Sequence, residues 1–374
     1  MHGTALDEMV DGHGGVRPHW RPLLGVIAGL GWDALGERAR RMDESFAELG
    51  ATSPLQDPPA SDPALPWRCD PIPLVLSETE FTALAEGLAQ RARLIEATLA
   101  DCLGPQRLLA EGVLPPGLVL GNPGFLRPCR FLPGPMLQLY AADLIRGPDG
   151  AWRVVADRTA APGGLAHALE HRELLARFVP ELFTTRPIRP LRPFFELWQD
   201  ALQRAAPPGA GQVVALMTTA RDGFEPALLA RELSCALVEG GDLTVRGGAL
   251  YLKTLSGLAR VAVLLRRQEG ARVDPLELDP DPSQGVAGLL DAARQGAVVI
   301  VNHPGAGLAE MPALAAFLPA LAPRLIGEKL ALGQAEARRR TRFQAFGHTP
   351  GAMEAPIGDT APESPRTLDL RRYG

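Results

Sequence analysis

The sequence contains little lysine, few aromatic residues and no apolar run of membrane-spanning length. Only two of its 38 basic residues are lysines, and the net charge of −5 gives no reason to expect a nucleic-acid partner. Apolar runs such as Ala297–Val301 have the length of a strand, far below the roughly 20 residues of a membrane helix. Residues 1–15 include acidic side chains and lack the apolar core of a signal peptide. We therefore expect a cytoplasmic globular protein that binds neither nucleic acid nor membrane.

Common signatures of nucleotide-binding and hydrolytic sites are also missing. The sequence contains neither a P-loop, G-x-x-x-x-G-K-[ST], nor the G-x-S-x-G elbow of serine hydrolases. Gly305-Ala306-Gly307 lacks the third glycine of a dinucleotide fingerprint, so a strand-to-helix turn is the simpler interpretation. The sequence therefore lacks the most common motifs for phosphate binding and for acyl transfer.

Cysteine is scarce and irregularly placed. The four cysteines, at positions 69, 102, 129 and 235, do not have the spacing of a zinc site. Because no export signal precedes them, we expect reduced thiols, as is usual in the cytoplasm. The simplest expectation is four buried and chemically inert side chains.

Proline and glycine divide the chain into four segments. Residues 1–66 are expected to form a helical arm, with a helix at about 30–49, that ends in a proline-rich linker. Residues 67–205 have a mixed α+β pattern, and residues 206–332 alternate strands with helices. Residues 333–374 have no sustained apolar period, so we expect a disordered tail. The fold class predicted from these patterns is α/β.

The mixed segment contains two helix signals and a hairpin signal. Ser77 and Glu80 form a potential capping box for a helix that ends near Gly104. The stretches MLQLYAADLIR and WRVVADRT flank GPDG, which predicts two antiparallel strands around a turn. A second helix is expected from the glycines at 163–164 to about Phe178.

From Val213 onward the pattern predicts a parallel, doubly wound sheet. The expected strands are VVALM, ARVAVLLRR and AVVIVN, with the helices PALLARELSCAL and GVAGLLDAARQG between them. The stretch LTVRGGALYLKT is expected to form a hairpin that turns at Gly247-Gly248. Ligands bind beyond the carboxyl ends of strands in such sheets, which is where Arg266-Arg267 and Asn302-His303 lie.

One short motif suggests a metal. His167, Glu170 and His171 spell H-x-x-E-H, the inverted zinc-peptidase motif. Two histidines four residues apart share a helix face and could hold Zn²⁺ between them. A zinc site also needs a third ligand, and spacing alone selects none of the downstream glutamates. A partly exposed helix with two ordinary histidines is the alternative, and we favour it.

The run VVADRTAAPGGLAHALEHR suggests a phosphate site. Asp157 ends a predicted strand, and the backbone N–H groups of Gly163 and Gly164 precede a predicted helix. A carboxylate in this position can hold Mg²⁺, while glycine amides and a helix N-terminus attract phosphate. Arg158 and Arg172 could clamp phosphate or carboxylate oxygens. The alternative is a hairpin turn with surface arginines.

Several longer stretches carry a family resemblance. They begin with Asp7-Glu8-Met9 and Arg17-Pro18-His19-Trp20 and are densest in GPQRLLAEGVLPPGLVLGNPGFLRPC. They continue in LYAADLIRGPDGAWRVVADRTAAPGG, LVEGGDLTVRGGALYLKTLSGL, LLRR with DPLEL, and FLPALAPRLIGEKL. Over residues 7 to about 332 the chain resembles the circularly permuted ATP-grasp family of type 2. The resemblance is to a bacterial subgroup often fused or adjacent to helical alpha-E proteins.

The resemblance implies a circularly permuted ATP-grasp-like fold with a Rossmann-like half at about 210–330. It also implies ATP- and Mg²⁺-dependent carboxylate–amine ligation through an acyl phosphate, on a small carboxylate or peptide-like substrate. The implied cofactor-binding residues are Arg158, Gly163, Gly164, Arg172, Arg266 and Arg267, and the implied Mg²⁺ ligands are Asp157, Glu269 and Asp274.

Some positions depart from the family pattern. The E-D-N cluster at the strand end reads Ala156-Asp157-Arg158, and only Glu269 and Asp274 remain of a later run of aspartates. Asp274 could instead cap the turn at Pro275. His167 and His171 stand where the family typically has Tyr and Asn, so H-x-x-E-H is best interpreted as sequence drift.

The C-terminal lid of the family is expected to be missing. No K-P-x-x-G-G segment occurs, and the last 42 residues resemble nothing in that region of the family. We therefore expect a ligase that is incomplete on its own, with a separate lid-bearing chain or an alpha-E type helical protein as partner. A non-catalytic binding or scaffold subunit is the main alternative, and a zinc hydrolase is a remote one.

Overall fold

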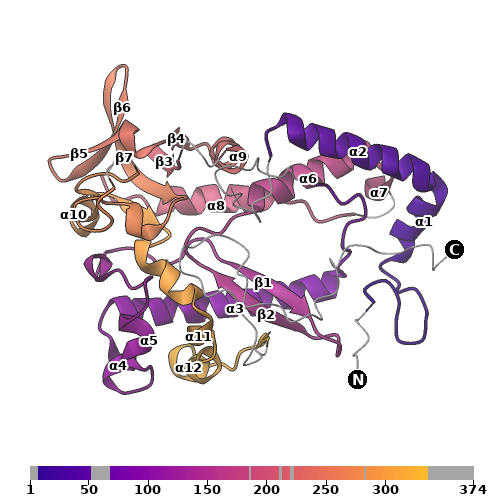
Figure 1. The fold of residues 1–374 in the computed structure, drawn as a ribbon, viewed down its shortest axis with the longest axis horizontal. Helices are drawn as coiled ribbons and strands as arrows, with labels where there is room; N and C mark the ends of the chain where they lie inside the picture. Colours follow the sequence, from indigo (N-terminus) through magenta and orange to yellow (C-terminus); the bar gives the residue numbers. More distant parts are fainter. Residues whose placement is uncertain are drawn as a thin grey trace.

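Two β-sheets, of three and six strands, organise the part of the chain that the structure describes. The computed structural model describes residues 7–51, 68–184, 187–209, 213–219, 223–281 and 284–335. In Figure 1 the small sheet lies beside a long helix, and the large sheet lies at the far side of the molecule from the N-terminal arm.

The N-terminal arm contains two helices, α1 (Arg21–Leu30) and α2 (Trp32–Glu48), where the sequence predicted one. Gly31 separates them, and its φ of 77° is a backbone conformation that glycine adopts at little cost. Phe46 of α2 is fully buried in a core that also contains side chains of α6 (Leu165–Phe178). The arm is therefore packed onto the body of the protein.

The long helix α3 (Glu78–Leu103) begins at the predicted cap and is followed by Gly104. Ser77 accepts a hydrogen bond from the Glu80 N–H at 3.3 Å. The Glu80 side chain does not complete the capping box, because it accepts a hydrogen bond from the Trp152 indole at 2.8 Å. The start of α3 is thereby tied to the hairpin.

The predicted hairpin is present as β1 (Ala141–Arg146) and β2 (Trp152–Arg158), which pair antiparallel. A third strand, β9 (Gly333–Gln334), pairs parallel with β2. The predicted tail boundary therefore falls inside this sheet. The predicted linker at 52–67 and the rest of the tail, 336–374, lie outside the described residues.

The predicted Rossmann-like sheet is also present. Its parallel core has the strand order β4-β3-β7-β8, with β3 (Val213–Met217), β4 (Ala236–Val238), β7 (Gly257–Arg266) and β8 (Val299–Val301). An antiparallel extension on β7 consists of β6 (Ala249–Thr254) and β5 (Leu243–Arg246). These two strands form the hairpin expected at Gly247-Gly248, so the sheet is mixed rather than wholly parallel.

Both faces of the parallel core are covered, because alternate side chains of each strand enter different cores. Ala215 of β3 packs with α10 (Leu289–Arg294), whereas Leu216 packs with α8 (Arg192–Arg204) and α9 (Phe224–Glu232). Figure 1 shows α8 and α9 beside the sheet on the side facing α6. Burial on both faces explains why these strands are continuous apolar runs.

Short helices account for the remaining regular structure of the described chain. In chain order they are α4 (Arg107–Ala110), α5 (Pro116–Leu120), η1 (Arg127–Cys129), α7 (Glu181–Thr184), η2 (Gly240–Asp242), η3 (Gly270–Arg272), η4 (Pro304–Glu310), α11 (Pro312–Ala315) and α12 (Leu318–Leu325). Among the described helices, none combines the length and the apolar character that a membrane span requires.

Candidate functional site

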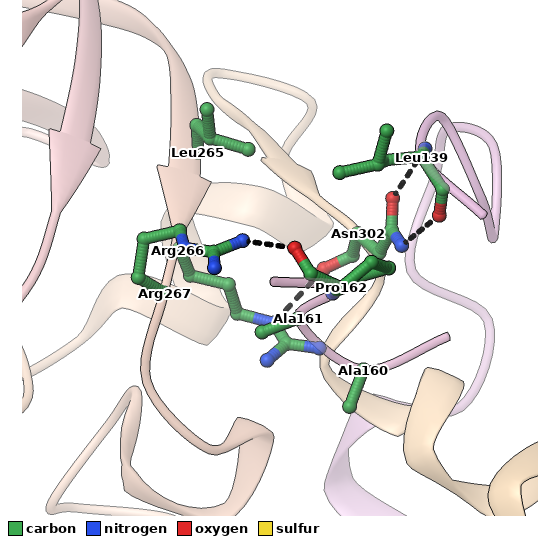
Figure 2. Close-up of a pocket in the computed structure, with 8 residues that line it drawn as sticks. All are labelled: Leu139, Ala160, Ala161, Pro162, Leu265, Arg266, Arg267 and Asn302. Carbon is green, nitrogen blue, oxygen red and sulfur yellow. Dashed lines mark hydrogen bonds between the residues drawn. The ribbon is translucent and has the colours of Figure 1, made fainter. Parts of the chain in front are cut away.

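The carboxyl ends of the parallel strands meet the loop 159–164, which joins β2 to α6. The winding of the sheet reverses between β3 and β7, and ligands of doubly wound sheets bind at such reversals. Figure 2 shows a pocket at this position, lined by Leu139, Ala160, Ala161, Pro162, Leu265, Arg266, Arg267 and Asn302. The structure therefore brings the predicted arginines of β7 beside the loop that carries the predicted glycines.

The N-terminus of α6 is occupied by a carboxylate of the chain itself. Glu225, in the first turn of α9, accepts a hydrogen bond from the Gly164 N–H at 2.6 Å. Gly164 is the N-cap residue of α6, and its φ of 90° favours glycine. The positive end of the helix dipole stabilises the negative charge of Glu225. A side-chain carboxylate thus takes the position that the sequence predicted for phosphate.

A second carboxylate holds the other end of the loop. The Oε1 atom of Glu310, at the end of η4, accepts hydrogen bonds from the N–H groups of Thr159 and Ala160, both at 2.7 Å. The Asn302 side-chain amide donates to the Thr159 carbonyl at 2.8 Å. The loop is therefore bonded at both ends to side chains of the Rossmann-like half.

Arg267 joins the middle of the loop to the sheet. Its guanidinium donates to the Pro162 carbonyl at 2.6 Å (Figure 2). It also pairs with the Oε2 atom of Glu225 at 3.3 Å. A Cβ atom on Gly163 would lie 3.1 Å from that oxygen and 3.3 Å from Arg267. Glycine at 163 therefore permits the loop to approach this ion pair closely, as it would permit a close approach to phosphate.

Arg266 anchors the ends of β7 and β8. Its buried guanidinium donates to the backbone carbonyls of Gln268, Asn302 and His303 at distances of 2.7 to 3.0 Å. Burial lowers the pKa of Arg266 to about 10, because removal from water disfavours the cation. The guanidinium groups of both arginines are therefore used in contacts within the protein.

Comparison with known proteins identifies the family. Residues 73–349, most of the chain, match the description of circularly permuted ATP-grasp type 2 proteins. The chain belongs to that family. The match confirms the resemblance and the α/β, ATP-grasp-like fold class, and it extends to residue 349, beyond the end predicted at about 332.

Curated relatives of this ATP-grasp chain come from bacteria. It is 39% identical over 341 residues to an uncharacterized protein of Mycobacterium tuberculosis, covering 87% of this chain and 38% of the relative. It is 32% identical over 324 residues to an uncharacterized protein of Synechocystis sp., covering 85% of this chain and 67% of the relative. The chain thus spans about two fifths of the length of the mycobacterial relative.

A solved structure also resembles this ATP-grasp chain. It is a glutathione synthetase-like effector from Globodera pallida, in its apo form, with a TM-score of 0.48 and 15% sequence identity. The superposition covers 79% of this chain and 67% of the effector.

Asp157, the first predicted Mg²⁺ ligand of this ATP-grasp chain, is paired with an arginine. Arg91 of α3 donates through Nε and Nη2 to its two oxygens, both at 2.7 Å, and the Tyr140 hydroxyl donates at 2.6 Å. Burial and the Asp157 carboxylate raise the pKa of Tyr140, so its hydroxyl stays protonated. Mg²⁺ at Asp157 would have to displace these donors.

The other predicted Mg²⁺ ligands are also committed to other contacts. Asp274 accepts three backbone N–H bonds at 3.0 to 3.2 Å and so caps the turn after it and the start of α10. The Oε2 atom of Glu269 lies 3.8 Å from the Nε atom of Arg272. Within the described residues, no group of three His, Cys, Asp or Glu side chains is placed to hold a metal ion. These residues do not fit Mg²⁺ as they stand, and its binding here stays a prediction.

Arg158 and Arg172 lie outside the pocket at the strand ends. Arg158 donates to Asp143 at 2.6 Å across the hairpin, and Arg172 donates to the Arg189 carbonyl at 3.1 Å. Burial lowers the pKa of Arg172. Neither arginine is among the residues that line the pocket in Figure 2. The phosphate role predicted for them stays a prediction.

The H-x-x-E-H residues lie in the packing between α6 and its neighbours. His167 is buried rather than partly exposed, and its ring stacks on Phe46 with 6.5 Å between centroids. The Nε2–H group of His171 donates a hydrogen bond to the Asp70 carbonyl at 3.0 Å. Burial raises the pKa of Glu170. These contacts give both histidines a packing role.

The thiols are buried or half-buried. Cys69, Cys102 and Cys129 are buried, and Cys235 is half-buried. Burial raises the pKa of each thiol to about 12, because the thiolate is disfavoured away from water. All four are therefore protonated at neutral pH, in agreement with the expectation of inert side chains.

Three residues that shape the site were not selected from the sequence: Arg91, Glu225 and Glu310. Glu225 lies 61 positions from Gly164, and Glu310 lies 151 positions from Thr159. An acidic residue in the first turn of a helix is ordinary, so Glu225 gave no local signal. Only the three-dimensional fold shows which N–H groups these carboxylates meet.

Proposed function

We propose that this protein is a ligase-type ATP-grasp relative that does not ligate unaided and serves as a binding or scaffold subunit. The occupation of the loop 159–164 by Glu225 and Glu310 carries the proposal. A nucleotide phosphate at this loop would compete with both carboxylates for the same N–H groups and would be repelled by their charge. ATP therefore does not fit the loop while the two side chains keep these positions.

The proposal includes a ligand class and a partner. The ligand class, a small carboxylate or peptide-like molecule, follows from the family resemblance; Arg267 would meet such a ligand by exchanging its contacts with the Pro162 carbonyl and Glu225. The partner we expect is an alpha-E type helical protein or a separate chain that carries the lid. We place this assembly in the cytoplasm.

Catalytic ligation is the second candidate, favoured by membership of the ATP-grasp family. It would require a partner or a domain movement to displace Glu225 from Gly164 and Arg91 from Asp157. The side chains as they stand support no reaction step through ATP or Mg²⁺.

Replacing Glu225 with alanine tests the proposal. Glu225→Ala frees the Gly164 N–H and the Arg267 guanidinium, so ATP should bind at least about tenfold more tightly than to the unaltered protein. This estimate follows because a hydrogen bond to a charged group contributes about 1.5–3 kcal/mol. Isothermal titration calorimetry with ATP and Mg²⁺ measures both Kd values.

Glu232→Ala is the matched control. Glu232 ends the same helix, α9, and pairs with Arg192 at 3.1 Å and with Arg231 at 3.0 Å. Its removal should leave ATP binding unchanged. Tight, saturable binding of ATP by the unaltered protein, with no gain in Glu225→Ala, would contradict the proposal and favour the catalytic candidate.

A further inference from the structure

The N-terminal arm carries a cationic turn separate from the loop 159–164. Arg17, His19 and Trp20 lie in one turn before α1, where the Trp20 N–H donates to the Arg17 carbonyl at 3.0 Å. Arg146, the last residue of β1, pairs with Glu8 at 3.0 Å, and the Arg17 N–H donates to the carbonyl of the next residue, Met9, at 2.8 Å. The arm and the hairpin therefore build this cluster together.

Arg146 is a fixed cation whose charge is already balanced. Its side chain is 9% exposed and pairs with Glu8 at 3.0 Å and with Glu80. Its guanidinium lies over the Trp152 ring, 4.7 Å from the centroid. These contacts hold Arg146 in place and join the arm, the hairpin and the start of α3.

Three buried N–H donors of the cluster have no acceptor among the described residues. They are the Nε–H groups of Arg17 and Arg146 and the indole Nε1–H of Trp20; the Nη2 atom of Arg146, also without a hydrogen bond of normal geometry, forms the ion pair with Glu80. Trp20 is only 1% exposed. An unpaired buried donor costs about 1–3 kcal/mol, and in the described part of the chain the cluster has no unpaired buried acceptor. These donors can be satisfied by a water molecule or by an anionic ligand, both of which supply an acceptor.

The electrostatics of the turn agree with a missing anion. Burial, and then the charges of Arg17 and Arg146, lower the pKa of His19. Asp11 lies close enough to feel the charge of Arg17, but its Oδ1 atom accepts two backbone N–H bonds within its own loop. Because Glu8 and Glu80 balance Arg146, the charge that an oxyanion at this turn would offset is that of Arg17.

We propose that Arg17, His19 and Trp20, together with Arg146, bind the oxyanion group of a small ligand, either a carboxylate or a phosphate. A guanidinium presents parallel N–H donors that match both groups. The indole and imidazole N–H groups add donors without adding charge. The site does not depend on the function proposed for the loop 159–164.

The His19 imidazole is a local reporter for the test. Its nuclear magnetic resonance signal is followed during separate titrations with inorganic phosphate and with succinate. We expect at least one probe to give a saturable shift and to raise the pKa of His19, because a bound anion stabilises the imidazolium. Phosphate alone would identify a phosphate ligand, and succinate alone a carboxylate. Arg17→Gln should weaken binding at least about tenfold.

Arg41→Gln is the matched control, because it removes one positive charge from the exposed surface of the same arm. Arg41 pairs with Glu37 at 3.1 Å, and its loss should leave binding unchanged. If Arg17→Gln fails to fold, Trp20→Phe removes the indole donor but keeps an aromatic ring, and it should also weaken binding. No saturable shift with either probe, or equal binding by the Arg17 and Arg41 variants, would overturn the proposal.

Discussion

Asp157 and Arg91 form an ion pair inside the protein, between the small sheet and α3. Two N–H donors of Arg91 lie 2.7 Å from the two carboxylate oxygens, a bidentate geometry that offsets part of the cost of removing both charges from water. The side chains are 0% and 1% exposed, so loss of one partner would leave the other buried and unpaired. Asp157 therefore stabilises the fold independently of any metal.

Asp157→Asn should lower the free energy of unfolding by about 3–5 kcal/mol, because it leaves the Arg91 charge uncompensated. Urea denaturation measures the change. Asp143→Asn on the paired strand is the control: the Asp143 side chain is 43% exposed and pairs with Arg158, so its loss should cost less than about 1 kcal/mol. An equal decrease in the free energy of unfolding in the two variants would show that the buried ion pair stabilises the fold no more than the exposed one.

Single residues were predictable where a local rule applied. Gly163, Gly164 and Arg267 were selected from the sequence, and the structure places them in one cluster with Glu225. For Asp274 the sequence left a metal ligand and a cap as alternatives, and its three N–H bonds show the cap. The partners of these residues were not predictable, because they lie far away along the chain.

At the scale of elements, the short helices η3 and η4, which follow β7 and β8 in the chain, contact each other. Gly270 begins η3, and a Cβ atom there would overlap the carbonyl oxygen of Pro304, the first residue of η4. The two backbones are therefore in direct contact. This contact fixes the relative position of the strand ends around the pocket.

Gly270→Ala should lower the free energy of unfolding by about 1–3 kcal/mol, because the added methyl group forces the two backbones apart. Gly36→Ala in α2 is the control, since a Cβ atom at that position meets nothing within 4 Å. It should raise stability by about 0.5–1 kcal/mol through helix propensity. Urea denaturation of both variants gives the sign of each change in the free energy of unfolding. A higher free energy of unfolding for Gly270→Ala would contradict the close contact.

Elements with a sustained apolar pattern were predicted closely. The strand VVALM is β3, and the helix expected to end near Phe178 is α6. The strand β4 was missed because its three residues follow α9 almost directly, and their apolar side chains suit a helix equally well. The helix predicted at about 30–49 is α2, whereas α1, which precedes Gly31, was not predicted.

At the scale of the whole molecule, the two sheets are joined through the loop 159–164 and through Asn302. The Asn302 amide donates to the carbonyls of Leu139 and Thr159 at 2.7 and 2.8 Å, so one side chain of the Rossmann-like half holds two segments of the other half. The family was predictable from collinear stretches of sequence, and the match over residues 73–349 confirms it. Glu225 and Glu310, which accept hydrogen bonds from the loop, belong to no sequence motif. They could not be predicted, because they meet the loop only in the folded chain.

Amide hydrogen exchange of the loop tests the central claim most directly. The N–H groups of Thr159, Ala160 and Gly164 donate to Glu310 and Glu225 in the free protein. We expect these three amides to exchange slowly without ATP, and to keep the same rates when ATP and Mg²⁺ are added. Rapid exchange that becomes slow only with ATP and Mg²⁺ would contradict the account, since the loop would then be open in the free protein and filled by nucleotide.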